Sequence, residues 1–389
     1  MLTLFSIILL TLFSFWIELK TNKSLPTLTG KYEVGRMALH LIDSSRTDSL
    51  SPPPFSKREL IVWIWYPAAT TQTDSIVEYI HSEWSKALNE QRGLVLKNFF
   101  ARDASKIHAH SFQSPKLFIG QVKYPVVLMK SGIGTMATDY SAFAEELASH
   151  GYIVVGNDAP YSTWLLRFPD GRLISRTSQG NPGETATFSD GGNSILNKLV
   201  QIWSDDTHFI LDQLVRINAD SSSMFFNRLD TSSVGIFGHS FGGATAAQFC
   251  SDDSRCKAGV DLDGAPFGSV IQKGLNKPFM FLLADHRNES DAVSTNIKKN
   301  IDGIYTSFSD NKVWIYLEGA GHFNFSDLPF QKEFIVTRLS GGTGSIGNSH
   351  GTEVISSCLL SFFDEHLRGQ SKTNIKKLDK QFPEIKFAK

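Results

Sequence analysis

Short apolar runs alternate with helical patterns along most of the chain. The apolar runs predict buried strands, and they cover residues 60–66, 125–129, 153–155, 234–237, 259–262, 279–283 and 313–317. Apolar residues at helical spacing predict helices over residues 140–150, 193–217 and 354–367. Strands that alternate with helices in this way are typical of an α/β fold, in which a mainly parallel sheet is flanked by helices.

Residues 160–192 interrupt this alternation, because Gly, Ser, Thr and Pro replace the regular pattern. A loop of this length inside a compact domain is often a lid or a binding loop. The loop contains four large apolar residues, Trp164, Leu165, Leu166 and Phe168. Such residues could form the wall of an acyl pocket or contact lipid, but we favour the interpretation that they pack beneath the loop. The chain has no internal repeat and no clean linker, so we predict a single domain over residues 25–369.

The two ends of the chain differ from this domain. Residues 1–17 carry no charge and are almost all apolar or hydroxylated. This length fits a secretory apolar region and also the lower limit of a membrane-spanning helix. The run therefore predicts export. Because no Lys or Arg precedes it and no A-x-A-like site follows it, the sequence leaves open whether residues 1–24 are a cleaved signal peptide or an N-terminal membrane anchor. Residues 370–389 are rich in Lys and predict a solvated basic tail.

Composition narrows the function further. Hydrophobic residues make up 41% and charged residues 20% of the chain, and the net charge is -1, which argues against a nucleic-acid partner. Cys250 and Cys256 predict a small-loop disulfide if the protein is exported and two buried thiols if it is not. They lack the further ligands of a structural zinc site. Cys358 lies in an apolar helical run and is expected in the core.

The sharpest local motif is Gly-His-Ser-Phe-Gly at residues 238–242. It follows a predicted strand and opens a helical run, which is the context of the nucleophile elbow of an α/β-hydrolase. At the elbow the serine occupies a strained turn, and the glycines are needed because a side chain would collide with the neighbouring strand or helix. We therefore predict Ser240 as a nucleophile.

A serine nucleophile needs a base and a carboxylate that orients the base, and on this fold they follow in the order serine, acid, histidine. His322 fits the base, because it lies on a glycine loop just after the last predicted strand. His350 follows no strand, His286 precedes the last strand, and His239 is held inside the elbow.

Two carboxylates fit the acid. Asp263 and Asp285 end consecutive predicted strands, and position alone does not choose between them. Asp261 lies mid-strand and is expected to support the fold. The backbone N–H of Phe241, after the nucleophile, and that of Ile133, in the turn at residues 130–134, are the predicted donors of the oxyanion hole. The sequence contains no HExxH or comparable metal-ligand cluster.

Residues 238–245, Gly-His-Ser-Phe-Gly-Gly-Ala-Thr, resemble the nucleophile motif of the plasma-type platelet-activating factor acetylhydrolases and their bacterial relatives. In that family the acid is the Asp of a Leu-Asp step soon after the nucleophile helix, which matches Leu262-Asp263. The family histidine stands in His-x-Asn-Phe-x-Asp, which matches residues 322–327. The resemblance therefore implies Asp263 as the acid.

This resemblance covers about residues 25–369, with the central loop least similar. One departure is Lys130-Ser131-Gly132, where the family usually has Ser-His-Gly. The resemblance implies a serine esterase for short acyl esters, including sn-2 acyl phospholipids, without a cofactor or metal. The alternatives are a general carboxylesterase or polyester hydrolase, and a catalytically silent binding protein with a hydrolase fold.

Overall fold

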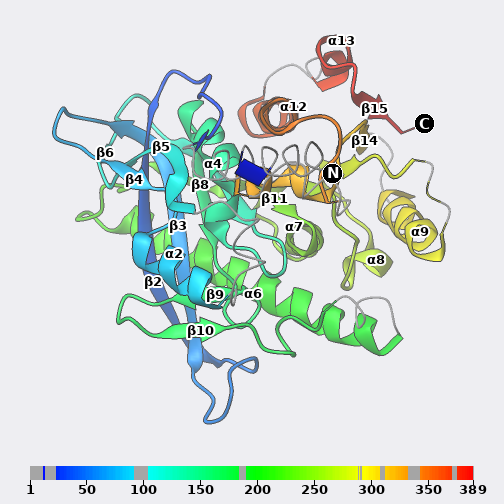
Figure 1. Ribbon diagram of the computed structural model, residues 1–389, viewed down its shortest axis with the longest axis horizontal. Coiled ribbons are helices and arrows are strands. Elements are labelled where there is room, and N and C mark those ends of the chain that lie inside the picture. Colours follow the sequence, from blue (N-terminus) through cyan, green and yellow to red (C-terminus); the bar gives the residue numbers. More distant parts are fainter. Residues whose placement is uncertain are drawn as a thin grey trace, which may run out of the picture.

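The structure is a computed structural model that describes residues 12–13, 23–91, 104–183, 190–287, 289, 291–306, 312–331, 342–369 and 375–388. Its centre is a twisted sheet in the order β1-β5-β2-β3-β8-β7-β11-β12-β13-β14-β15 (Figure 1). The parallel centre consists of β8 (Ile153–Asn157), β7 (Tyr124–Lys130), β11 (Leu229–His239), β12 (Cys256–Leu262), β13 (Phe279–Ala284) and β14 (Lys312–Leu317). The predicted α/β-hydrolase architecture is confirmed.

Long antiparallel strands extend the sheet on its N-terminal side. β2 (Glu33–Thr47) pairs with β3 (Lys57–Ala69), and β3 pairs with β8. The outer and accessory strands are β1 (Lys23–Ser24), β4 (Ile76–Glu78), β5 (Ile107–Gln113) and β6 (Lys116–Leu117). A separate hairpin is formed by β9 (Leu165–Arg167) and β10 (Leu173–Ser175).

Helices cover both faces of the sheet (Figure 1). One face packs against α4 (Ser141–Ser149) and α12 (Asn348–Arg368). The other face packs against α6 (Asp190–Ala219), α7 (Phe241–Asp252), α8 (Val270–Lys273) and α9 (Ala292–Thr306). Successive strand residues alternate between these two cores, as Val126 and Val127 do, which is why the central strands appear in the sequence as continuous apolar runs. The remaining helical segments are α2 (Ser82–Gln91), α10 (Leu328–Gln331), α13 (Leu378–Gln381), η1 (Ala104–Lys106), η2 (Ala137–Tyr140), η3 (His322–Phe325) and η4 (Ile375–Lys377).

The C-terminal residues correct one expectation. Instead of a solvated tail, residues 375–388 fold back onto the domain. β15 (Ile385–Phe387) pairs antiparallel with β14, and Ile375, Phe382 and Ile385 are buried in the core. The apolar residues spaced among the lysines drive this docking, since their burial removes apolar surface from water.

Within the long loop, Leu165, Leu166 and Phe168 are buried, so packing is the main role of its apolar side chains. The predicted N-terminal segment lies largely outside the described residues. No helix in the part of the chain that is described has the length and apolar character needed to span a bilayer. Cys250, in α7, forms a disulfide with Cys256, the first residue of β12, and Cys358 is a buried free thiol.

Candidate active site

Ser240 stands between β11 and α7 at the carboxyl edge of the parallel strands. Its φ is 56° and its ψ is -123°, a conformation that non-glycine residues rarely adopt. The glycines on either side allow the turn. A Cβ at Gly238 would lie 2.1 Å from the Gly242 oxygen, and a Cβ at Gly242 would lie 2.4 Å from the Lys130 oxygen. The turn is therefore pressed against β7, as the elbow motif requires.

Asp263 follows β12, and its carboxylate reaches the histidine loop. His322 Nδ1 lies 2.7 Å from Asp263 Oδ2, and the Ala284 N–H donates to Oδ1 at 2.8 Å. Burial alone would raise the pKa of Asp263, but hydrogen bonds from His286 and His322 hold it well below its usual range. The carboxylate is therefore charged, and a proton on His322 Nδ1 leaves Nε2 as the acceptor nitrogen of that ring.

The backbone ties Ser240 to the same strand end. The Ser240 N–H donates to the Leu262 oxygen at 2.8 Å, one residue before Asp263. A Cβ at Gly264 would lie 2.4 Å from the Ser240 oxygen, so the chain on the other side of Asp263 also contacts the elbow. Ser240, Asp263 and His322, far apart in sequence, thus belong to one edge of the sheet.

The other candidates from the sequence have different partners. The carboxylate of Asp285 pairs with Arg287, with N–O distances of 2.6 and 3.0 Å. His350 is an exposed residue of α12, and its Nε2 lies 2.9 Å from Glu384 Oε1. Asp261 is buried and accepts a hydrogen bond from the Gly264 N–H at 2.6 Å, in keeping with a supporting role.

The residues that follow His322 fix its loop. Asn324 Oδ1 accepts hydrogen bonds from the N–H groups of Gly321 and Gly344, both at 2.8 Å. Phe325 is fully buried. Asp327 accepts from the Ala142 N–H, at the start of α4, at 3.2 Å. The His-x-Asn-Phe-x-Asp segment is thus a set of anchors for the loop that carries the imidazole.

A hydrogen-bonded chain that the sequence did not reveal joins the turn at residues 130–134 to His322. The Gly132 N–H donates to Tyr140 Oη at 2.9 Å, and Tyr140 Oη lies 2.8 Å from His239 Nδ1. His239 Nε2 in turn lies 3.0 Å from the His322 carbonyl oxygen. Burial, followed by repulsion from the cationic form of His322, lowers the pKa of His239 well below its ordinary value, so its ring is neutral. Tyr140 gave no sequence signal, because an aromatic residue at the start of a helix looks like core.

Lys130, the departure from the family motif, is buried at the end of β7. Its Nζ donates to Asn157 Oδ1 at 2.6 Å and lies 5.4 Å from the centroid of the Trp203 ring. Burial lowers its pKa to about 8. The backbone of the turn is nevertheless held, because the Thr135 N–H and hydroxyl both bond to the Gly132 oxygen, at 3.1 and 2.8 Å.

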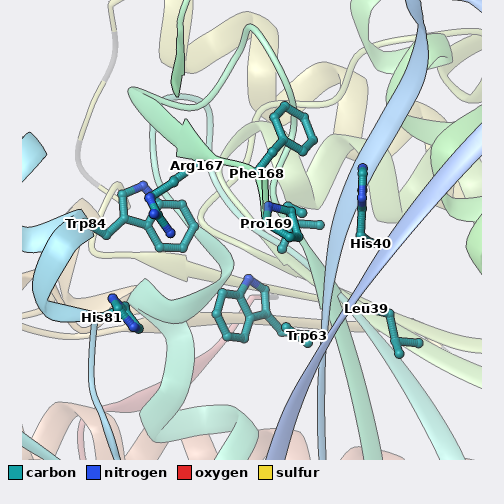
Figure 2. A pocket seen from close by; sticks show the side chains of 10 residues that line it. Leu39, His40, Trp63, His81, Trp84, Arg167, Phe168 and Pro169 are labelled. Atoms are coloured by element: carbon teal, nitrogen blue, oxygen red, sulfur yellow. The ribbon is translucent and has the colours of Figure 1, made fainter. Parts of the chain in front are cut away.

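A cavity of about 170 Å³ lies between the β2–β3 strands, α2 and the β9 segment. Figure 2 shows the aromatic side chains of Trp63, Trp84 and Phe168 around this space. The ring centroids of Trp63 and Trp84 lie 6.1 Å apart, and Trp63 Nε1 donates a hydrogen bond to Asp158 Oδ2 at 2.9 Å. Phe168 thus has two roles, in the packing of the loop and in the wall of a cavity.

Among the described residues, no group of His, Cys, Asp and Glu side chains is arranged to hold a metal ion.

Comparisons with known proteins agree with this architecture. A ferulic acid esterase from Streptomyces cinnamoneus superposes with a TM-score of 0.76 at 26% identity, over 95% of this chain and 100% of that protein. The fold and this likeness define the class, a carboxylic ester hydrolase of the α/β-hydrolase type. The family model described as platelet-activating factor acetylhydrolase, isoform II, matches residues 17–159 and 195–383, and the chain belongs to this family.

Curated relatives carry related names. The platelet-activating factor acetylhydrolase of Cavia porcellus is 24% identical over 371 residues, which is 89% of this chain and 78% of that protein. The protein of the same name from Canis lupus familiaris is 26% identical over 63% of this chain and 57% of its own length. A probable 1-alkyl-2-acetylglycerophosphocholine esterase of Arthroderma benhamiae is 25% identical over 68% of this chain and 66% of its own length. The family resemblance expected from the sequence motifs is confirmed.

Proposed function

We propose that the protein is a serine esterase that hydrolyses short acyl esters through Ser240, His322 and Asp263. The observation that supports this most is the 2.7 Å contact between His322 Nδ1 and Asp263, beside a serine with a φ of 56° at the elbow. In this mechanism His322 Nε2 takes the Ser240 hydroxyl proton as the serine oxygen attacks the ester carbonyl. The imidazolium that forms is stabilised by the Asp263 carboxylate.

The tetrahedral intermediate carries a negative oxygen, for which we propose the N–H groups of Phe241 and Ile133 as donors. Phe241 is the first residue of α7, where a helix offers no internal acceptor for the N–H. Collapse of the intermediate breaks the ester bond, and His322 returns the proton to the leaving alcohol. Water, deprotonated by His322, then hydrolyses the acyl-enzyme and restores Ser240.

The proposed substrates are phospholipids with a short sn-2 acyl group, in line with the names of the curated relatives. A general carboxylesterase acting on non-lipid esters is the second candidate, and the likeness to a ferulic acid esterase favours it. Rates on p-nitrophenyl acetate, p-nitrophenyl decanoate, methyl ferulate and a 2-acetyl phospholipid separate the two. A preference of at least tenfold for the phospholipid supports the first candidate, and the reverse preference supports the second.

Labelling by a fluorophosphonate tests the nucleophile itself. We expect one label on Ser240, found by mass spectrometry of the digested protein, and none on a Ser240→Ala variant. The Ser232→Ala variant, which changes an exposed serine at the start of β11, is the matched control and should label normally. A folded wild-type protein that takes no label at Ser240 would support the silent binding protein instead.

We also propose that the protein is exported and that residues 25–388 form one catalytic domain. The apolar N-terminal run and the Cys250–Cys256 disulfide support export, since disulfides persist in oxidising compartments. Fractionation of the producing cells, with N-terminal sequencing of the protein recovered, tests this. Recovery in the cytosol with both thiols reduced would contradict it.

A further inference from the structure

A second histidine contacts the carboxylate that we propose as the orienting acid. His286 Nε2 lies 3.1 Å from Asp263 Oδ1, while His322 Nδ1 lies 2.7 Å from Oδ2. The Asp263 side chain is only 3% exposed, so these contacts are made largely out of water. One buried carboxylate is therefore shared by two imidazoles, one on each oxygen. The triad motifs in the sequence indicate only one of them.

The local chain holds His286 in this position. It lies two residues beyond the end of β13, and its N–H donates to the Ala284 oxygen at 2.7 Å. Its other ring nitrogen, Nδ1, lies 2.9 Å from Glu289 Oε1. The side chain is 38% exposed, so one side of the ring faces solvent and the other faces Asp263.

The charged groups around His286 favour its cationic form. Asp263 and Glu289 contact the ring directly, and His322 lies on the far side of Asp263. Nearby, the Arg287 guanidinium forms ion pairs with Asp285 and Glu318. Lys298 of α9 donates hydrogen bonds to the carbonyl oxygens of Arg287 and Glu289. The hydrogen bond to Asp263 is the main cause that raises the pKa of His286, to about 9. The ring is therefore charged at neutral pH.

We propose that His286 is a positioning residue of the active site, which holds the Asp263 carboxylate and, as a cation, weakens the attraction of that carboxylate for the His322 imidazolium. This rests on the proposed function of Asp263 and His322. The imidazolium forms in each chemical step, and a positive charge on the opposite oxygen of the same carboxylate opposes it. His322 is then free to act as a base at lower pH than it would be beside an isolated carboxylate.

His286→Gln tests this, because glutamine keeps a polar side chain and cannot carry the charge. We expect the acid limb of the pH profile of kcat/KM to move to higher pH by about half to one pH unit. His350→Gln is the matched control, since His350 also pairs with a carboxylate, Glu384, but on a different part of the surface. It should leave the profile unchanged. Superimposable profiles for the wild type and His286→Gln would overturn the proposal.

A second measurement does not need activity. In NMR spectra of protein with isotopically labelled histidines, the His286 ring should titrate well above neutral pH in the wild type. Its pKa should be lower by about one pH unit or more in Asp263→Asn. Titration of His286 near its ordinary value in the wild type would overturn the proposal, even if His286→Gln fails to fold. Failure of the proposed function is a separate result, in which the wild type neither hydrolyses esters nor takes a label at Ser240.

Discussion

Asp263 Oδ2 lies 2.7 Å from His322 Nδ1, although the two residues are 59 positions apart in the chain. Asp285, which ends the neighbouring strand, pairs with Arg287 instead. The difference follows from the backbone, because Asp263 has a φ of 54° and turns immediately after β12. The two carboxylates that are equivalent by their position after predicted strands therefore have different partners.

This geometry predicts opposite outcomes for two conservative variants. Asp263→Asn should lower kcat by about 10⁴-fold, because an amide cannot stabilise the imidazolium and favours the wrong tautomer of His322. Asp285→Asn should leave kcat nearly unchanged, because the Asp285 carboxylate pairs with Arg287 and not with His322. Steady-state hydrolysis of p-nitrophenyl acetate by both variants is the measurement. A large loss in Asp285→Asn alone would show that the acid is assigned to the wrong carboxylate.

The close approach of the elbow to β7 gives a second prediction. A Cβ at Gly242 would lie 2.4 Å from the Lys130 oxygen and 2.5 Å from the Ser131 oxygen, so Gly242→Ala must push the elbow away from the turn at residues 130–134. We expect kcat to fall by about 10²-fold, since a shift of about 1 Å at an active site costs this much. The rate of fluorophosphonate labelling should fall with it.

Gly303→Ala is the control for this variant. Gly303 lies in α9, and among the described residues outside this helix's own backbone the nearest atom to a Cβ there would be the Ile271 oxygen, at 4.0 Å. The alanine should leave kcat unchanged and raise the free energy of unfolding by about 0.5–1 kcal/mol, because it restricts the unfolded chain. Equal activities of the two variants would argue against a strained elbow.

The sequence predicts the parallel centre of the sheet because its strands are buried on both faces and stand out as apolar runs. It does not predict β2, whose polar residues alternate with apolar ones on a partly exposed strand. It also places Ser240, Asp263 and His322 after strands, where the topology brings them to one edge. The roles of Tyr140 and His286 depend on contacts across the sheet and on side-chain direction, which no local pattern encodes.

The disulfide links the helix that follows Ser240 to the strand that precedes Asp263. It closes a short loop, with a sequence separation of 6. Loop-closure entropy in the unfolded chain predicts that the bond contributes about 2 kcal/mol to the free energy of unfolding. The Cys250→Ser, Cys256→Ser double variant should therefore unfold at lower urea concentration. Cys358→Ser, which changes the buried free thiol and keeps the disulfide, is the control. Added dithiothreitol should lower its urea midpoint as much as it lowers that of the wild type.

A buried ion pair gives a prediction for stability and its pH dependence. Arg58 binds Asp206 through two nitrogens, at 3.1 and 2.7 Å, and both side chains are almost fully buried. Asp206→Ala should lower the free energy of unfolding by about 3–5 kcal/mol, because the guanidinium loses its main buried partner. Asp170→Ala removes an exposed pair with Arg172 and should leave the free energy of unfolding close to that of the wild type.

The sign of the pH effect follows from the pKa of Asp206. Burial alone would raise that pKa, but the charge and hydrogen bonds of Arg58, together with the charges of Arg46 and Lys130, more than offset it, and the folded pKa lies below the usual value. The unfolded carboxylate therefore binds a proton first as the pH falls, near pH 4. The stability from this pair is complete above that pH and is lost as the pH falls towards the folded pKa. Urea midpoints measured from pH 7 to pH 3 should fall more steeply below pH 4 in the wild type than in Asp206→Ala, and parallel curves would contradict the assignment.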